Sequence, residues 1–145
     1  MYQIQIVSYG STAYEQVLKL REEVLRKPLG LQLTEKDVAQ DADEIIIGAF
    51  DIQGHIAGCV QLRKISKKQL KLRQMAVASH LQKQGIGHRL VDFAEDVALQ
   101  KKYEMMVLNA RETALSFYQK LGYATHSQAF LEVGIWHYKM NKSLK

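Results

Sequence analysis

Alternating apolar and polar positions predict extended segments in the first half of the chain. Residues 2–8 alternate with period two, which is typical of a strand with one buried face. The apolar run 45–50 and the segment 55–62, joined by turn residues, predict a hairpin. Charged residues at 63–68 indicate a second turn, and the apolar positions within 70–77 predict a third consecutive antiparallel strand.

Helical signals separate the first strand from this group of strands. Ser11 or Thr12 can cap a helix whose apolar positions recur every three or four residues, and Pro28, the only proline, stops it. Residues 28–43 predict a loop with one short capped helix that begins near Thr34.

The second half of the chain changes its period after the third of these strands. Residues 86–99 repeat at helical spacing, and 113–121 predict a short helix. The apolar stretches 105–108 and 133–140 predict strands. The predicted order is therefore strand, helix, short helix, three strands, helix, strand, helix and strand, which is an α/β (α+β) arrangement.

Composition narrows the class of protein. A length of 145 residues builds one core more readily than two, so we expect a single domain over 1–145. The 47% of apolar and 24% of charged residues exclude a disordered or fibrous chain. A balance of 20 Lys and Arg against 15 Asp and Glu gives +5, which favours an anionic ligand such as a cofactor phosphate, nucleic acid or a membrane surface.

Cysteine usage and the start of the chain indicate the compartment. Cys59 is the only cysteine, so no intramolecular disulfide forms, and its place in a strand favours a core role over a nucleophilic one. Neither a secretory leader nor an apolar run of about 18 residues is recognisable, and no metal-ligand cluster stands out. We expect a cytoplasmic protein without a bound metal.

The segment between the third consecutive strand and the long helix carries the clearest chemical signal. Backbone amides of 83–88 can converge at a helix N-terminus and bind an anion. Gly85 allows a positive φ, Gly87 leaves room beside the backbone, and Lys83 and Arg89 add positive potential. The alternative is an ordinary turn between a strand and a helix. Walker A and dinucleotide-binding loops need other residues after Gly87.

The spacing Gln82-x-x-Gly85-x-Gly87 resembles the cofactor loop of the GNAT superfamily of N-acetyltransferases. A second similar block follows, with Leu108-Asn109-Ala110 and then Ala114-x-x-Phe117-Tyr118-x-x-Leu121-Gly122-Tyr123. The resemblance implies a sheet that is mixed, mostly antiparallel, splayed in the middle and flanked by helices, with acetyl-CoA as acetyl donor. It assigns cofactor contacts to Met75, Ala76, Val77, Gln82, Lys83, Gln84, Gly85, Ile86, Gly87, His88, Arg89, Asn109 and Phe117.

The same resemblance places Tyr118 near the sulfur of the thioester. A phenol there can protonate the thiolate that leaves when an amine attacks the acetyl group. Phe117, Tyr118 and Leu121 also fit the buried stripe of a short helix, which is the alternative interpretation.

A general base is harder to assign. Some members of the family use a glutamate on the strand before the cofactor loop, but residues 70–77 contain no carboxylate. Glu132 and His137 are the candidates instead, within an ending similar to that of the ElaA-like branch, from which Trp136 departs. His137 can titrate near neutral pH, although a histidine at this place in a strand can equally be packed or exposed.

These observations predict an acetyl-CoA-dependent N-acetyltransferase that moves an acetyl group directly to a primary amine of a small molecule or peptide. A homodimer is compatible with the family, and neither nucleic acid nor a membrane is expected as a partner. The alternatives are an acetyl-CoA-binding module without turnover and a basic nucleic-acid-binding domain.

The charged residues 63–73 are expected to form a solvated hairpin, and acidic residues within 22–44 could attract a cationic acceptor or serve as caps.

Overall fold

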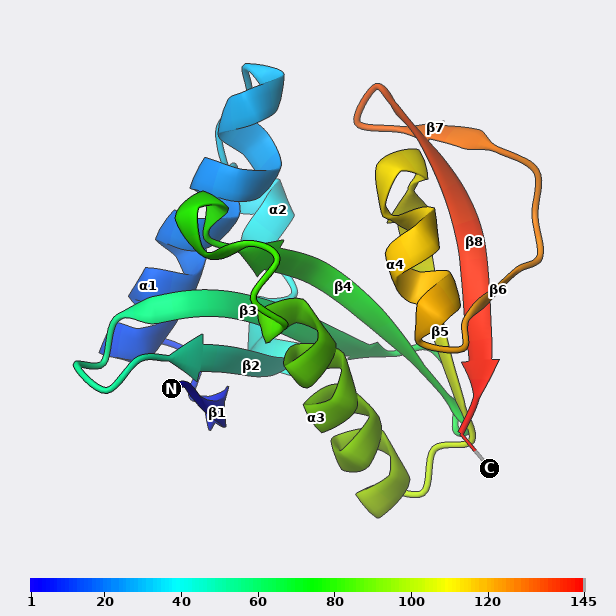
Figure 1. Cartoon of the computed structure of the whole chain (residues 1–145), viewed down its shortest axis with the longest axis horizontal. Coiled ribbons are helices and arrows are strands. Elements are labelled where there is room, and N and C mark those ends of the chain that lie inside the picture. Colours follow the sequence, from blue (N-terminus) through cyan, green and yellow to red (C-terminus); the bar gives the residue numbers. More distant parts are fainter. Residues whose placement is uncertain (145) are drawn as a thin grey trace.

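An open sheet lies at the centre of residues 1–144, which the computed structural model describes (Figure 1). Its eight strands follow the order β1-β2-β3-β4-β5-β8-β6, and β7 pairs with β8. The strands are β1 (Gln3–Val7), β2 (Ile45–Phe50), β3 (Ile56–Lys64), β4 (Gln69–Val77), β5 (Met105–Arg111), β6 (Ala124–Thr125), β7 (Phe130–Glu132) and β8 (Ile135–Ser143). All pairs are antiparallel except β4 with β5, which confirms a mixed, mostly antiparallel sheet.

Helical segments connect the strands. The α-helices are α1 (Thr12–Arg21), α2 (Glu35–Val38), α3 (Ile86–Gln100) and α4 (Leu115–Lys120). A π-helical turn, Glu22–Arg26, and a 3-10 turn, Lys27–Leu29, extend α1. Further 3-10 turns are Asp41–Asp43, Ser79–Leu81 and Glu112–Ala114.

The predicted helix caps are present. The Ser11 hydroxyl oxygen accepts a hydrogen bond from the Tyr14 amide at 3.1 Å, which satisfies one free donor in the first turn of α1. Thr34 and Asp37 form a reciprocal capping box at the start of α2. Pro28 lies in the 3-10 turn that follows α1, so the sequence signal for the end of this helical stretch is confirmed.

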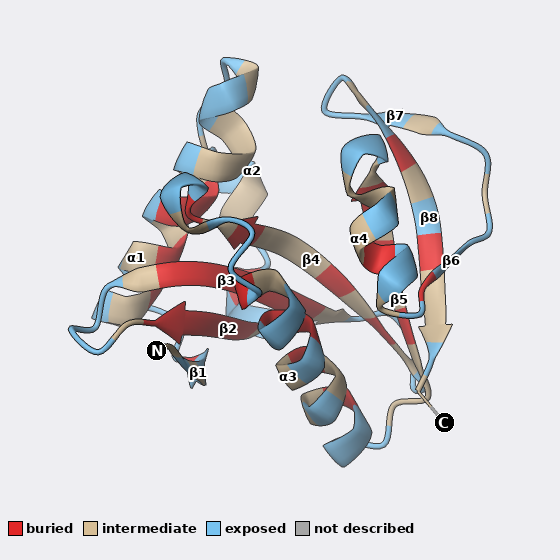
Figure 2. Ribbon diagram, viewed as in Figure 1, coloured by how far each residue is buried: buried red, intermediate tan, exposed pale blue. Residues whose placement is uncertain are grey.

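Two apolar clusters cover the two faces of the sheet. Ile86, Leu90 and Tyr118 bring α3 and α4 against one face, together with buried residues of β2 to β5 and β8. Val17 and Leu20 bring α1 against the other face. The buried positions of β2 and β3 between these helices are continuous along the strands in Figure 2. The helices therefore bury both faces of this half of the sheet.

The sheet splits between β4 and β5. These two strands pair only from Gln69 with Met105 to Leu72 with Leu108, and the paths of β4 and β5 then separate (Figure 1). A register shift between β3 and β4 and a left-handed Gln74, with φ of 56°, bend β4 away. Meanwhile β5 stays paired with β8 as far as Arg111. The predicted splay is confirmed, and we call this opening the V.

Three strand predictions need correction. β6 and β7 were not expected, and β8 begins two residues later than predicted because Val133 and Gly134, both with positive φ, form the turn before it. The expectation of one buried face for β1 is wrong at Ile6, whose side chain is 52% exposed. The α3 cluster reaches Ile4 but not Ile6, so the end of this edge strand lacks a covering helix.

Candidate active site

The V leaves one edge of a strand without a partner. Beyond Leu72, β4 still pairs with β3 through Arg73, Ala76 and Val77, while its opposite edge has no strand beside it in the described chain. Every second backbone group along such an edge is free to bind an extended ligand. The strand predicted to hold the pantetheine arm therefore borders the opening.

The loop after β4 leads directly into α3. Lys83 and Gly85 both adopt left-handed conformations, with φ of 67° and 82°, and the helix begins at Ile86. The amides of 83–88 make no hydrogen bond to any acceptor within residues 1–144. The first N–H groups of a helix have no carbonyl partner within the helix, so they are left to bind other groups. A Cβ added to Gly85 would meet nothing within 4 Å, so the space beside this residue is open. This end of α3 can hold an anion on its backbone.

Several loop side chains already contact the protein. Gln82 Nε2 donates to the Val77 carbonyl at 3.2 Å, and the Tyr2 hydroxyl donates to Gln84 Oε1 at 3.4 Å. His88 Nε2 lies 3.3 Å from Asp92 Oδ2. These contacts hold the predicted side chains against neighbouring elements, while the backbone amides remain open.

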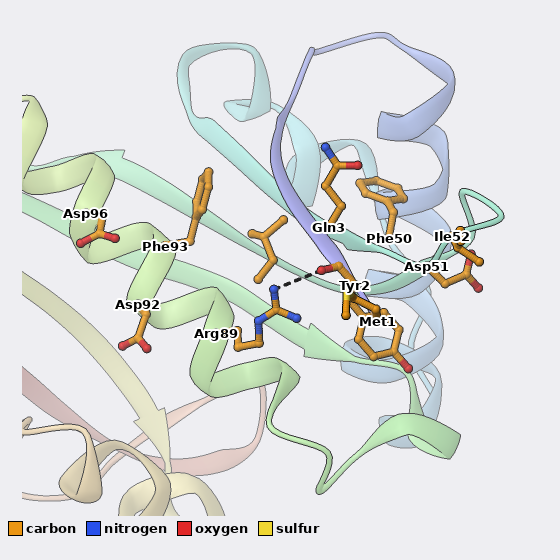
Figure 3. Close-up of a pocket in the computed structure, with 11 residues that line it drawn as sticks. Met1, Tyr2, Gln3, Phe50, Asp51, Ile52, Arg89, Asp92, Phe93 and Asp96 are labelled. Carbon is orange, nitrogen blue, oxygen red and sulfur yellow. Dashed lines mark hydrogen bonds between the residues drawn. The ribbon is translucent and has the colours of Figure 1, made fainter.

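Arg89 faces a groove that has a volume of about 710 Å³ and lies between β1, the end of β2 and α3. Its guanidinium group donates to the Tyr2 carbonyl at 3.1 Å, and Phe93 and Phe50 line the same groove (Figure 3). The structure therefore places the Arg89 side chain against β1, while its backbone belongs to the first turn of α3.

Close packing brings α4 to the start of α3. A Cβ on Gly87 would lie 3.1 Å from Phe117 Cζ and 3.9 Å from a methyl carbon of Val77. The absent side chain therefore lets the Phe117 ring approach the helix backbone at the end of β4. This contact places Tyr118, the next residue, at the same end of the V.

Tyr118 is both packed and chemically available. Its side chain is 6% exposed and its ring lies edge-on to Phe117 at 4.9 Å and to Tyr123 at 5.8 Å. Burial raises the pKa of Tyr118, so the phenol stays protonated at neutral pH. Its hydroxyl has no hydrogen-bond partner in the described chain, whereas the Tyr123 hydroxyl donates to Glu95. The core position and a proton-donating role are thus compatible.

The two predicted base candidates lie together. Glu132 Oε2 is 3.5 Å from His137 Nε2, and the second oxygen of Glu132 accepts from Asn109 Nδ2 at 3.2 Å. His137 Nδ1 bonds the Ile135 carbonyl at 2.8 Å and must therefore donate, which leaves Nε2 with a lone pair when the ring is neutral. His137 is 4% exposed and Glu132 about half exposed, so the histidine is packed and the carboxylate reaches solvent.

These groups occupy opposite faces of the sheet. Leu108 and Ala110 point into the cluster with α3, α4 and Tyr118, so Asn109 between them points to the other face. The register pairs Arg111 with His137, which places the histidine on that other face too. The V is the passage between the phenol on one face and the carboxylate–imidazole pair on the other.

Several charged residues lie elsewhere than expected. Residues 64–68 form an exposed hairpin, as predicted, but Lys71 and Arg73 are half-buried on the face that carries Asn109. Arg73 bonds Glu44, which also binds Arg63 and is itself 1% exposed. The expectation of a solvated hairpin throughout 63–73 is therefore wrong, because Lys71 and Arg73 are only partly exposed and Arg73 pairs with a buried carboxylate.

The acidic residues of the α1–β2 connection also have structural partners. Asp41 accepts from Arg21 at 2.7 Å and from the Tyr14 hydroxyl at 2.6 Å, and all three side chains are buried. Gln61 joins this network through both its amide nitrogen and its oxygen. Asp37 serves in the capping box of α2. The sequence offered no signal for this network beyond ordinary charge, since its partners come from distant segments.

Cys59 is fully buried in the cluster that packs α1 against the sheet. Burial raises the pKa of this thiol to about 12, so the reactive thiolate is absent at neutral pH. Within residues 1–144, no three His, Cys, Asp or Glu side chains are grouped so as to hold a metal ion. None of the helices in this range is long and apolar enough to cross a membrane.

The comparisons with known proteins agree with this geometry. The family model described as an acetyltransferase (GNAT) domain matches residues 10–144. The chain belongs to the GNAT acetyltransferase family. This GNAT chain is 35% identical over 74 residues to the uncharacterized protein YyaT of Bacillus subtilis (strain 168), which is 51% of this chain and 50% of YyaT. It spans about half the length of the curated relatives that it matches.

Solved structures share the GNAT fold over nearly the whole chain. ElaA of Escherichia coli matches with a TM-score of 0.84 at 17% identity, covering 98% of this chain and 99% of that chain. A GNAT family acetyltransferase from Elizabethkingia anophelis, solved with acetyl-CoA bound, matches with a TM-score of 0.74 at 20% identity, covering 98% and 97%. At these identities the likeness is one of fold, and it includes the ElaA fold that the sequence ending suggested.

Proposed function

We propose that this chain transfers an acetyl group from acetyl-CoA to a primary amine. The observation that carries the proposal is the V, with an unpaired edge of β4 on one side and the free amides at the start of α3 at its end. An extended thioester with an anionic tail matches both features, because the edge can pair with its amides and the helix terminus can hold its phosphates. Family membership supports the same cofactor.

The cofactor contacts follow from these surfaces. The pyrophosphate would lie on the amides of 83–88, with Lys83 adding positive charge nearby. The pantetheine arm would pair with Met75–Val77, beside the Phe117 ring that packs on Gly87. Asn109 would face the arm from the other side of the V, while its amide group also holds Glu132.

Tyr118 would act as the general acid. The attack of the amine nitrogen on the thioester carbonyl forms a C–N bond and breaks the C–S bond, and the departing thiolate takes the phenolic proton. The raised pKa keeps that proton on Tyr118 until the thiolate develops. Because no group of the described chain accepts a hydrogen bond from this hydroxyl, no internal bond must break first.

Glu132 and His137 would receive the amine and take its proton. Carboxylate Oε2 and imidazole Nε2 are 3.5 Å apart, and both can accept a hydrogen bond from one ammonium group. Loss of the proton to this pair produces the neutral amine that attacks. In this proposal, Glu132 of β7 and His137 of β8 take the role of the glutamate that β4 lacks.

The transfer would be direct, with donor and acceptor bound together. A ping-pong route needs an accessible nucleophile, and Cys59 is buried with a raised thiol pKa. In this proposal, the acceptor would approach the V from the face that holds Glu132 while the donor would lie along β4. Reactants held in contact need no covalent enzyme intermediate.

Isothermal titration with acetyl-CoA tests the cofactor proposal. We expect saturable binding that weakens as salt increases, because phosphate contacts are electrostatic. The absence of binding at millimolar acetyl-CoA would contradict the proposal. Binding without any transfer would instead favour an acetyl-CoA-binding module, and a salt-sensitive interaction with nucleic acid alone would favour the third class of function.

A further inference from the structure

The face of the sheet that carries Asn109 is rich in cations. Residues at alternate positions of neighbouring strands share a face, so the register groups Arg63 with Lys71 and Arg111 with His137 there. The basic face, as we call it, consists of Arg63, Lys71, Arg73, Arg111 and Lys139. The carboxylates that interact with these cations are Glu44 and Glu132.

The carboxylate of Glu44 already forms ion pairs with two of these cations. Glu44 is 1% exposed and accepts from Arg63 at 2.6 Å and from Arg73 at 2.5 Å. Its other oxygen accepts from Gln61 at 2.9 Å. Both arginines therefore have a buried partner, and their fit to Glu44 explains their place in the fold.

Lys71 and Arg111 differ from this pair. Both are half-buried, and neither lies within 4.0 Å of a carboxylate oxygen in the described chain. The Arg111 guanidinium donates to the Leu25 carbonyl at 3.3 Å, and Lys71 has no hydrogen bond from its amine to residues 1–144. A cation that is partly removed from water is stabilised by an anion close to it.

The positive charges near Lys71 and Arg111 outnumber the negative ones. Burial lowers the pKa of Lys71, and Arg73, Arg63 and Lys139 lower it further against the opposing effect of Glu132. Burial and the nearby Arg26 lower the pKa of Arg111 in the same way. Within residues 1–144, Glu132 is the carboxylate that acts on both cations, and it also contacts Asn109 and His137. An additional anion would be stabilised here.

Their position relates them to the reacting groups. Leu72 and Leu108 form the last pair before β4 and β5 separate, so Lys71 lies one residue before the apex of the V. Arg111 lies three residues past the apex on β5, opposite His137. The two cations therefore flank the opening on the face where Glu132 and His137 would receive an amine.

We infer that the acceptor is an amine that also carries an anionic group, a carboxylate or a phosphate, and that Lys71 and Arg111 bind this group. The inference rests on the proposed function. The ammonium group binds between Glu132 and His137, and the anion lies on the cations beside them. The acidic residues of 22–44 could suggest a cationic acceptor instead. Two of them, Asp41 and Glu44, are buried in ion pairs and are therefore not free to bind one.

The experiment compares amines that differ only in the anionic group. Glycine is paired with glycinamide, and phosphoethanolamine with ethanolamine, so the two pairs separate a carboxylate from a phosphate. Binding to the protein saturated with CoA is measured by calorimetry, and acetylation is measured by thiol release. We expect at least one anionic amine to bind about tenfold or more tightly than its neutral partner, as a charge-assisted contact allows.

The variants Lys71→Met and Arg111→Met assign the effect to the two cations. Each should raise the KM and the Kd of the anionic acceptor about tenfold, and leave the neutral acceptor and the affinity for acetyl-CoA unchanged. Lys67→Met, at the exposed hairpin, is the matched control and should change neither. Arg111→Lys should restore part of the affinity, since it retains the charge.

Three results would overturn the inference. They are equal or tighter binding of the neutral amines, no effect of either variant on anionic acceptors, and loss of acetyl-CoA affinity in the variants, which would assign the cations to the cofactor. Acetylation of neutral amines alone contradicts only this inference. Binding of an anionic amine without thiol release contradicts the proposed function and leaves the anion site supported.

Discussion

Tyr118 combines a tightly packed ring with a hydroxyl that has no partner in the described chain. Ring packing stabilises the fold, whereas the hydroxyl is the group that we propose as proton donor to the thiolate. A substitution that removes one oxygen therefore separates structure from chemistry at this residue. The buried side chains of Arg21, Asp41 and Gln61 differ from Tyr118, because they form hydrogen bonds with one another.

Tyr118→Phe should lower turnover by about 10²-fold or more with little change in the affinity for acetyl-CoA, because only the proton donor is lost. Its thermal midpoint should stay close to that of the wild type, since no internal hydrogen bond is broken. Steady-state kinetics, calorimetry and thermal melts measure these quantities. Tyr9→Phe, at an exposed tyrosine, is the control, and unchanged turnover in Tyr118→Phe would remove this residue from the mechanism.

Asp41→Asn should destabilise the fold by about 3 kcal/mol, because it leaves the buried Arg21 guanidinium without its counter-charge. Urea denaturation measures the free energy of unfolding. Lys68→Gln is the control, since the Lys68 side chain is mostly exposed and loss of its pair with Glu104, at 3.8 Å, should cost less than about 1 kcal/mol. A similar small effect in both variants would show that the network contributes little to stability.

The buried tyrosines predict a loss of stability at alkaline pH. Burial raises the pKa of Tyr14, with a further contribution from its hydrogen bond to Asp41. Above pH about 10, the unfolded chain releases this proton while the folded chain retains it, so the free energy of unfolding falls as pH rises. Below that pH both states are protonated and this effect is absent.

Denaturation titrations on both sides of pH about 10 test this linkage. Tyr14→Phe should show a shallower alkaline decline than the wild type, because one of the three tyrosines with raised pKa is removed. An identical decline in the two proteins would show that Tyr14 does not contribute.

At the scale of elements, local sequence signals predict most of the fold. Ser11, Thr34 and the periodicity of 86–99 identify helices that form where expected, since caps and amphipathic spacing act locally. β6 and β7 could not be predicted, because they have two and three residues and depend on pairing with β8. Glu132 lies on β7, so its contacts with Asn109 and His137 could not be predicted from the sequence either.

The loop before α3 gives a prediction at this scale. Gly85→Ala should weaken acetyl-CoA binding, because a side chain at φ of 82° strains the backbone, by about 1 kcal/mol or more, and occupies the open space beside the free amides. Gly54→Ala is a matched control, since this glycine has φ of 84° and equally open surroundings but lies in the β2–β3 turn. Equal acetyl-CoA affinity in both variants would exclude the loop as the anion site.

At the scale of the whole molecule, net charge gives less information than its placement. The balance of +5 suggested an anionic ligand, but the hairpin lysines 64–68 are exposed while Lys71 and Arg111 lie beside the V. Their grouping depends on the parallel pairing of β4 with β5 and on the pairing of β5 with β8. No local pattern carries that information, because the three strands are separated along the chain.

The two faces of the sheet also divide the proposed chemistry. Tyr118 belongs to the cluster with α3 and α4, whereas Glu132 and His137 lie on the face that carries Asn109. A donor that enters along β4 and an acceptor that enters over the basic face would meet at the V. The proposed direct transfer would therefore depend on the splay of β4 from β5.

Thiol release from acetyl-CoA, followed with a chromogenic reagent across a broad panel of amines, tests the central claim most directly. We predict release that depends on both the protein and an amine, with one acetylated amine formed for each thiol and with strong loss in Tyr118→Phe. Saturable binding of acetyl-CoA with no amine-dependent release across the panel would contradict the account.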